Sequence, residues 1–417
     1  MPGYVIDAEA GRGGPLTGPR TGHRCRVLRV VGELNFGGTE ARTAELLPRL
    51  VAAGTEVHLV TLADRVGPGP LAGAIVRHGG SVSPLPLDVR FPARFRRLLR
   101  LLRPDVVHVD CANFSGVILC LAGLAGVPVR VAHFRGDDNQ HRNRRQRVCR
   151  WIWGRLLRMS ATDILGVSPS ALTCGYDPAW RDDPRCRVVL NGLDLDRLRT
   201  PTGDDLRAVT GAAPGDLLCL TVGRASPEKR RWLLPPILAA LRDRGVSAHA
   251  VLVGPRDDAD DARVRGAAAA AGLADRVHLL GPRDDVGALL RQADVVVHPS
   301  CLEGLPGGVL EPVALGVGTV AADLPGVRFI SEHLPGVTVV ATDAPPAAWA
   351  AAVLTAAGHT ATTDPAAAAD RFARSVFSIE EATATHVAIY RRPEGPPRNR
   401  VVGDRSRPRA GSERWDR

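Results

Sequence analysis

The segment HPSCLEGLPGGVLEPVALG, residues 298–316, constrains the fold more than any other part of the chain. The residues before it, 293–297, read ADVVV, which is typical of a buried strand. A loop rich in glycine and proline follows at 303–308, and an apolar helical pattern begins near Val309. Strand, glycine-rich loop and helix N-terminus together can bind phosphate, because free backbone N–H groups and the helix dipole face the anion. The segment therefore predicts an α/β fold with an anion-binding loop.

Two carboxylates flank this loop, Glu303 at its start and Glu311 about one turn into the helix. A carboxylate at the second position repels phosphate, but it can accept hydrogen bonds from the vicinal hydroxyls of a ribose or a hexose. The motif EGLPGGVLE, with its Glu-x7-Glu spacing, resembles the signature of retaining nucleotide-sugar glycosyltransferases with the GT-B fold, in the family 4 (glycosyl transferases group 1) type. The alternative is an ordinary strand-to-helix turn with two surface glutamates.

A second strand–turn–helix unit begins with the apolar strand 217–222 and the turn GRASPEK, residues 223–229. It lacks the GxxxxGK[ST] pattern of a P-loop. Lys229 is the single lysine among 54 Lys and Arg residues, and the two types are not interchangeable where a compact charge must fit. The turn resembles the family's GRxxxxK segment, in which the Arg and the Lys, here Arg224 and Lys229, reach the donor diphosphate. The alternative is two solvated loop cations.

The N-terminal half opens with a strand–helix–strand pattern over 26–31, 39–50 and 56–62, which is typical of a doubly wound sheet. Its first loop has no GxGxxG pattern, so a dinucleotide site is not supported. Gly37 and Gly38 match the Gly-Gly loop that faces donor and acceptor across the cleft in the resembled family. The alternative is a plain tight turn.

His133 ends an apolar strand at 127–133, and ligands of open α/β sheets collect at that carboxyl edge. The position resembles the one where related transferases place a histidine beside the reacting sugar. The resemblance therefore makes His133 a catalytic candidate, together with Glu303, Arg224 and Lys229. The alternative is a strand-end histidine that only caps a loop.

The resemblance covers residues 26–390 and implies the GT-B fold: α/β, with two Rossmann-like doubly wound domains facing across a cleft. Asn191-Gly192 is expected to be the hinge, since both residue types tolerate positive φ. A loop is expected at 323–327 and a final helix at 372–390. The expected parts are a flexible leader (1–24), an N-terminal acceptor-side domain (25–191), a C-terminal nucleotide-sugar-binding domain (192–372), a crossover helix returning to the N-terminal domain (373–390) and a disordered tail (391–417).

Length and composition indicate how many domains the chain has and in which cellular compartment it is expected. A length of 417 residues suits two domains of ordinary size. No stretch reaches about 18 to 20 uninterrupted apolar residues, so no membrane span is expected. Residues 1–24 contain no apolar signal segment, which favours a cytoplasmic protein. The eight cysteines form no CxxC pair and no cluster with histidine, so we expect reduced cysteines and no zinc site.

Residues 141–159 combine many arginines with Trp151 and Trp153. Three interpretations compete: a surface helix whose Trp and Leu side chains face the core, which we favour; a peripheral contact with the anionic inner face of the membrane; or a nucleic-acid-binding helix. The net charge of +10 adds little, because acidic residues are interspersed among the arginines. No nucleic-acid partner is expected.

The resemblance implies that the protein transfers a sugar from a nucleotide-diphosphate donor, a UDP- or GDP-sugar, to an acceptor hydroxyl with retention at the anomeric carbon. It implies that the N–H groups of Gly308, Val309 and Leu310 bind the diphosphate with the two cations, that Glu311 binds the ribose, and that Glu303 lies near the donor hexose. Neither a metal nor another cofactor is expected, because two fixed cations can stabilise the leaving diphosphate.

The expected acceptor is a sugar, a lipid-linked intermediate or a small molecule, in polysaccharide, glycolipid or natural-product biosynthesis. A protein of another class, a non-catalytic nucleotide-sugar-binding partner, is the alternative. A nucleic-acid-binding protein is a third hypothesis, which the positive charge motivates and which leaves the Glu-x7-Glu spacing unexplained.

Overall fold

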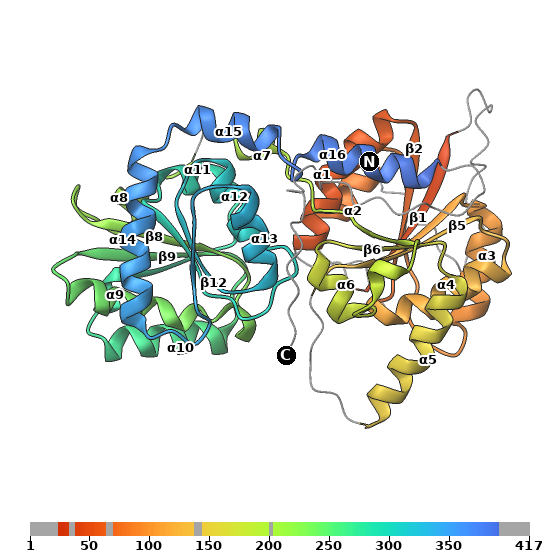
Figure 1. Cartoon of the computed structure of the whole chain (residues 1–417), viewed down its shortest axis with the longest axis horizontal. Coiled ribbons are helices and arrows are strands. Elements are labelled where there is room, and N and C mark those ends of the chain that lie inside the picture. The colour runs from red at the N-terminus through yellow and green to blue at the C-terminus, as the bar shows by residue number, and fades with distance from the viewer. Residues whose placement is uncertain (1–23, 33–37, 64–69, 137–143, 200–202, 392–417) are drawn as a thin grey trace, which may run out of the picture.

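The computed structural model describes residues 24–32, 38–63, 70–136, 144–199 and 203–391. Within these ranges the chain forms two lobes, each built on a parallel β-sheet flanked by helices (Figure 1). The first sheet has seven strands in the order β3-β2-β1-β4-β5-β6-β7, and the second has six in the order β10-β9-β8-β11-β12-β13. Counted from its own first strand, the second sheet follows the order 3-2-1-4-5-6 of a doubly wound fold, and the first sheet follows the same order with a seventh strand added. The sequence predicts such doubly wound sheets.

The strands of the first sheet are short apolar runs, because helices cover both faces of a parallel sheet. They are β1 (Cys25–Val31), β2 (Thr55–Thr61), β3 (Val82–Pro84), β4 (Val106–Val109), β5 (Val129–Phe134), β6 (Asp163–Gly166) and β7 (Cys186–Val188). The helices of this lobe are α1 (Gly38–Ala52), α2 (Pro70–Arg77), α3 (Phe91–Leu102), α4 (Ser115–Leu124), α5 (Arg144–Ser160) and α6 (Pro169–Gly175).

The second lobe follows two short helices, α7 (Leu195–Leu198) and α8 (Leu206–Thr210). Its strands are β8 (Leu217–Val222), β9 (Ala248–Val253), β10 (Val277–Gly281), β11 (Val295–His298), β12 (Thr319–Ala322) and β13 (Val337–Val340). Its helices are α9 (Leu234–Arg242), α10 (Asp258–Ala270), α11 (Val286–Gln292), α12 (Gly307–Ala314), α13 (Pro325–His333) and α14 (Pro346–Thr362).

Two helices, α15 (Pro365–Ala373) and α16 (Ile379–Tyr390), carry the chain from the second lobe back to the first (Figure 1). The sequence predicts one helix over 372–390, and this prediction is wrong: the helix is interrupted, and α16 begins after Ser378. The Ser378 hydroxyl caps α16 by accepting a hydrogen bond from the Glu381 N–H at 3.2 Å. The apolar face of α16 then packs on the first lobe with side chains of α1, β1 and β5.

Gly192 is needed for the close packing of the returning chain and not for a positive φ. The glycines with positive φ in the described ranges do not include it. A Cβ at Gly192 would lie 2.8 Å from Ile379 Cα and 2.6 Å from Ala382 Cβ. The missing side chain therefore lets α16 approach the segment between the lobes, which is not the reason that the sequence suggested.

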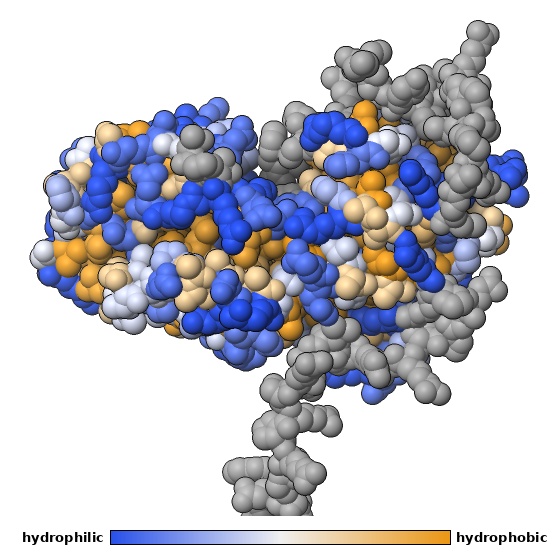
Figure 2. All heavy atoms as spheres, turned by 90° about the horizontal axis from the view of Figure 1, so that it is seen from above, coloured by the Kyte–Doolittle hydropathy of each residue, from blue (hydrophilic) through white to orange (hydrophobic). Residues whose placement is uncertain are grey.

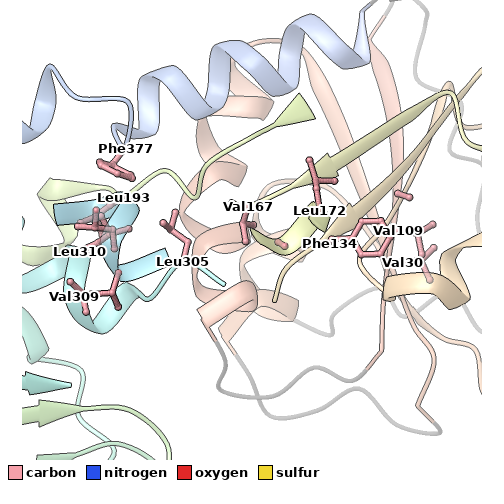
Figure 3. Close-up of a cluster of buried hydrophobic side chains, with 14 of the residues drawn as sticks. Val30, Val109, Phe134, Val167, Leu172, Leu193, Leu305, Val309, Leu310 and Phe377 are labelled. Atoms are coloured by element: carbon pink, nitrogen blue, oxygen red, sulfur yellow. The ribbon is translucent and has the colours of Figure 1, made fainter. Parts of the chain in front are cut away.

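One hydrophobic cluster runs from the first lobe into the second without a break. Val167, after β6, and Leu305, in the loop before α12, lie between the lobes, and Phe134 and Leu310 continue the cluster on either side (Figure 3). Each of these side chains is at most 6% exposed. The loop that the sequence assigns to the donor site is thus held against the first lobe.

The prediction of a loop at 323–327 is wrong in part, because α13 already begins at Pro325. Proline suits this first helical position, since its missing N–H would have no partner there. None of the helices in the described ranges is both long and apolar enough to cross a membrane.

Candidate functional site

The start of α12 lies against the carboxyl ends of β8 and β11, where the strand order of the second sheet reverses. A Cβ at Gly308 would lie 2.9 Å from His298 Nδ1 and 3.2 Å from the Val222 carbonyl oxygen. Only glycine therefore lets the first turn of α12 come so close to the two strand ends. Crevices at such reversal points bind ligands in open α/β sheets.

Lys229, His298 and Glu303 meet at this point. The Lys229 Nζ lies 2.5 Å from Glu303 Oε1, and the His298 Nε2 lies 3.0 Å from the same oxygen. The Lys229 side chain is 20% exposed and that of Glu303 14%, so the pair is largely but not fully enclosed. Burial by itself raises the pKa of Glu303, but the hydrogen bond from His298 and the charge of Lys229 lower it to about 2. Glu303 is therefore ionised at neutral pH.

Arg224 does not join this group. Its side chain is 55% exposed and forms an ion pair with Glu228 at 3.0 Å, so it is directed to solvent. Arg230 instead holds the neighbouring loops together, with its Nε donating to the Pro299 carbonyl (2.7 Å) and its Nη1 to the Thr342 carbonyl (2.8 Å). Of the two cations that the sequence assigns to a diphosphate, the structure brings Lys229 alone to Glu303.

Some of the backbone amides at the start of α12 are hydrogen-bonded within the helix, and others are not. The N–H groups of Val309 and Leu310 donate to the Pro306 carbonyl at 3.2 and 3.1 Å, so they are engaged within the helix. The expectation that both are free for an anion is therefore wrong for this structure. Gly307 and Gly308 lie in the first turn, where an N–H has no acceptor within the helix. These two amides are the ones that α12 can offer to an anion.

Glu311, expected to bind a ribose, is held by two guanidinium groups from outside its own lobe. Arg42 of α1 contacts its Oε1 at 2.6 Å, and Arg197 of α7 contacts the same atom at 2.8 Å. Both arginines also pair with Glu45, at 2.9 and 2.7 Å. These four side chains form a ring of alternating charge that joins α1, α7 and α12. Figure 2 shows hydrophilic residues gathered where the two lobes meet.

His133 lies in the interior of the first lobe and not on its surface. It is 1% exposed, and its Nδ1 lies 3.1 Å from His108 Nε2. His108 in turn contacts the Tyr390 hydroxyl at 2.8 Å, and the His386 ring stacks on it. Burial lowers the pKa of His133, His108 and His386, so all three rings are neutral. The structure therefore places His133 under α16 and away from solvent.

Asp110 stands beside these histidines, and three groups, His108, Asp110 and His133, lie close enough to hold a metal ion. Their surroundings do not suit a cation. Arg29 and Arg135 both contact Asp110, at 2.7 and 2.8 Å, and already neutralise its charge. A divalent cation there would face two guanidinium groups at short range.

The loop after His133 nevertheless touches the donor-side loop. A Cβ at Gly304 would lie 2.8 Å from the Arg135 carbonyl oxygen and 2.9 Å from Gly136 Cα. His133 and Glu303 are therefore linked through adjoining backbone, without direct contact between their side chains. Gly37, the other first-lobe candidate, lies outside the described residues, and Gly38 is the first residue of α1.

Comparisons with known proteins agree with this geometry. Residues 216–359 match the family described as glycosyl transferases group 1, and residues 37–173 match the glycosyl transferase 4-like domain. The chain is 27% identical over 342 residues to EpsF of Bacillus subtilis (strain 168), covering 80% of this chain and 88% of that protein. It is 29% identical over 328 residues to the GDP-mannose:cellobiosyl-diphosphopolyprenol alpha-mannosyltransferase of Xanthomonas campestris, covering 75% and 83%. The chain is a glycosyltransferase.

Its fold is GT-B. The transferase is similar to the crystal structure of Anabaena HepE in complex with UDP, with a TM-score of 0.69 and 18% identity, covering 87% of this chain and 98% of that one.

Sequence reasoning missed several residues that organise the site of this transferase. Arg42, Glu45 and Arg197 carry no motif, and Glu311, the partner of the two arginines, lies more than 100 positions away from each of them in the sequence. His298 was visible as the first residue of the 298–316 segment, at the end of a strand. Its position at a carboxyl edge was the available signal.

Proposed function

We propose that this transferase moves a sugar from a nucleoside-diphosphate donor to an acceptor hydroxyl with retention at the anomeric carbon. The observation that carries the proposal is the contact of the single lysine, Lys229, with Glu303 beside the first turn of α12. A partly exposed ammonium, an ionised carboxylate and helix amides at one strand-order reversal suit a diphosphate joined to a sugar.

In this proposal the donor diphosphate replaces Glu303 as the partner of the Lys229 ammonium. It also accepts a hydrogen bond from the N–H of Gly308. Arg224 is exposed and can swing from Glu228 onto the outer phosphate. Glu311 accepts hydrogen bonds from the ribose hydroxyls. Glu303, left ionised, then faces the positive charge that develops on the sugar ring as the bond to the diphosphate breaks.

The reaction follows from these contacts. The bond between the anomeric carbon and the diphosphate oxygen breaks, and the acceptor oxygen forms the new bond on the same face of the sugar. The departing diphosphate oxygen takes the proton of the acceptor hydroxyl. Cationic side chains supply the charge stabilisation in this scheme, so no metal and no further cofactor is invoked.

The proposed donor is a UDP- or GDP-sugar, and the proposed acceptor is a lipid-linked saccharide of polysaccharide or glycolipid biosynthesis. The named substrates of the Xanthomonas relative, GDP-mannose and a diphosphopolyprenol-linked cellobiose, support both choices. His133 is too deeply buried to touch either substrate in this structure. We assign it a positioning role, through the loop Arg135–Gly136 that adjoins Gly304.

The test is a panel of UDP- and GDP-sugars, each offered with a lipid-linked saccharide acceptor, with release of nucleoside diphosphate as the readout. Proton NMR of the product reports whether the anomeric configuration is kept, and addition of EDTA checks the proposed metal independence. Lys229→Ala and Glu303→Gln are expected to lower release by about 10²–10³-fold while leaving the melting temperature nearly unchanged. Thermal stabilisation by a nucleotide sugar without release for any acceptor would favour the non-catalytic binding partner instead.

A further inference from the structure

Helix α5 (Arg144–Ser160) has one face fixed against the first lobe. The Trp153 ring meets Phe114 edge to face, with ring centroids 5.2 Å apart, and the Leu157 side chain is fully buried. A Cβ at Gly116 of α4 would lie 2.2 Å from the Trp153 carbonyl oxygen, so the two helices touch at backbone distance. This close packing fixes the rotation of α5 and with it the residues that face outward.

The outward face of α5 is apolar at its centre. Val148 is 51% exposed, Trp151 63%, Ile152 45% and Met159 77%. Their spacing of three, four and seven residues places them on one stripe of a helix. The interpretation that the Trp and Leu side chains of this segment face the core therefore holds for Trp153 and Leu157 and is wrong for Trp151.

The same face is positively charged. Arg144, Arg145 and Arg155 are exposed and share the arc of the apolar stripe, and the Arg155 guanidinium lies over the Trp151 ring at 5.5 Å. The helix sequence RRQRVCRWIWGRLLRMS contains no acidic residue. A long exposed stripe of Val, Trp, Ile and Met, interspersed with arginine, is costly in water.

We propose that the outer face of α5 docks this transferase on an anionic lipid surface. Apolar side chains that alternate with arginines on one helical face can enter the boundary between headgroups and acyl chains, while the guanidinium groups stay at the anionic headgroups. Tryptophan is favoured at that depth because its ring is amphipathic. Phosphodiester backbones would use the arginines but leave Val148, Ile152 and Met159 exposed to water, so lipid accounts for the whole face.

The position of α5 suits such docking. The helix projects from the lower edge of the first lobe in the view of Figure 1, where it packs on α4 and on the turn Ala112–Phe114 of the same lobe. Bound lipid would therefore not block the crevice between α12 and β8. The inference goes beyond the proposed chemistry and does not depend on it, because the face is defined by exposure and charge alone.

The experiment is co-sedimentation of the full chain with two kinds of vesicle. One contains phosphatidylcholine alone, and the other contains phosphatidylcholine with about 30 mol per cent phosphatidylglycerol, which gives the surface a negative potential. Wild-type protein is expected to bind the anionic vesicles at least about tenfold more tightly than the neutral ones, and less tightly as salt rises. Trp151→Ala/Ile152→Ala and Arg145→Glu/Arg155→Glu are each expected to weaken that binding about tenfold or more.

Matched controls lie on the second lobe. Leu354→Ala on α14 removes an exposed apolar side chain, and Arg265→Glu on α10 reverses an exposed charge. Both are expected to bind vesicles like wild type, and circular dichroism should report the same fold for every variant. Equal binding to neutral and anionic vesicles, or α5 variants that bind like wild type, would overturn the proposal. So would α5 variants that lose nucleic-acid binding or self-association while vesicle binding persists.

Discussion

Asp110 follows the fourth strand of the first sheet, and Glu303 follows the fourth strand of the second, yet their surroundings differ. Asp110 is 2% exposed and contacts two guanidinium groups, those of Arg29 (2% exposed) and Arg135 (13%). Glu303 contacts one ammonium and one histidine, and the ammonium of Lys229 is 20% exposed. The first group is sealed by α16, whereas the second borders the crevice at α12.

We call Asp110, its two arginines and the neighbouring histidines the structural cluster. We call Lys229, Glu303 and His298 the binding cluster, after their role in the proposed mechanism. A buried ion pair that water cannot reach affects only the stability of the folded protein, because no ligand can replace either of its two charged groups. The Lys229–Glu303 pair can exchange partners, because a phosphate oxygen can replace the carboxylate without opening the core. The same strand position thus carries a buried charge cluster in one lobe and, in the proposed mechanism, the donor contacts in the other.

The largest effect is expected from Asp110→Ala. Removing this carboxylate breaks its buried ion pair with Arg29, and breaking such a pair typically costs about 3–5 kcal/mol of the free energy of unfolding. Urea unfolding followed by circular dichroism measures this. Glu303→Gln is the matched control, because Lys229 keeps access to water, and it should cost clearly less. Equal losses for both variants would contradict the distinction between the two clusters.

Lys229→Ala tests the binding cluster. We expect turnover with the best donor of the panel to fall by about 10²–10³-fold, because a fixed cation at the leaving group is lost. The melting temperature should stay close to that of wild type. Arg265→Ala on α10 removes an exposed cation elsewhere in the same lobe and should leave turnover unchanged. Turnover of Lys229→Ala at the wild-type rate would remove Lys229 from the site.

Much of the fold was open to prediction from the sequence, for local reasons. The strand β8 begins and ends at the predicted residues 217–222, because it is an apolar run bounded by Asp216 and Gly223. The start of α13 was missed, because Pro325-Gly326 has the composition of a turn as well as that of a helix start. The break before α16 was missed because a serine cap within a helical pattern is weak evidence against continuity.

The site was predictable only where its parts lie close in sequence. Lys229 and Glu303 were marked by their own loops, and the structure brings them together. The partners of Glu311 could not be found, because Arg42 approaches it across 269 positions and only the docking of two lobes makes the contact. The burial of His133 depends in the same way on α16, which returns some 250 positions later. Contacts set by the packing of distant elements leave no local pattern.

Lowering the pH should weaken the structural cluster before the binding one. Burial lowers the pKa of His386 from 6.5 to about 3, so between these values the unfolded chain binds a proton that the folded chain does not. The free energy of unfolding therefore falls as pH drops below 6.5, by roughly 2 kcal/mol at pH 5 from this residue alone. Urea unfolding at pH 7, 6 and 5 measures the slope. His386→Leu should flatten it, and an unchanged slope would contradict the neutral, buried state of this ring.

The smallest effect concerns the ring that joins the lobes. Arg197 is 41% exposed, so its pair with Glu311 is worth at most about 1 kcal/mol. If Glu311 binds ribose, the donor hydroxyls must compete with this guanidinium for the same oxygen. Arg197→Ala should then lower the KM for the donor by up to about fivefold with little change in kcat. Arg199→Ala is the control, since Arg199 is also on the surface of the connection and pairs only with Asp196 among the ion pairs of the described residues. A rise in KM for Arg197→Ala would instead make Arg197 a ligand of the donor, and Glu311 its support.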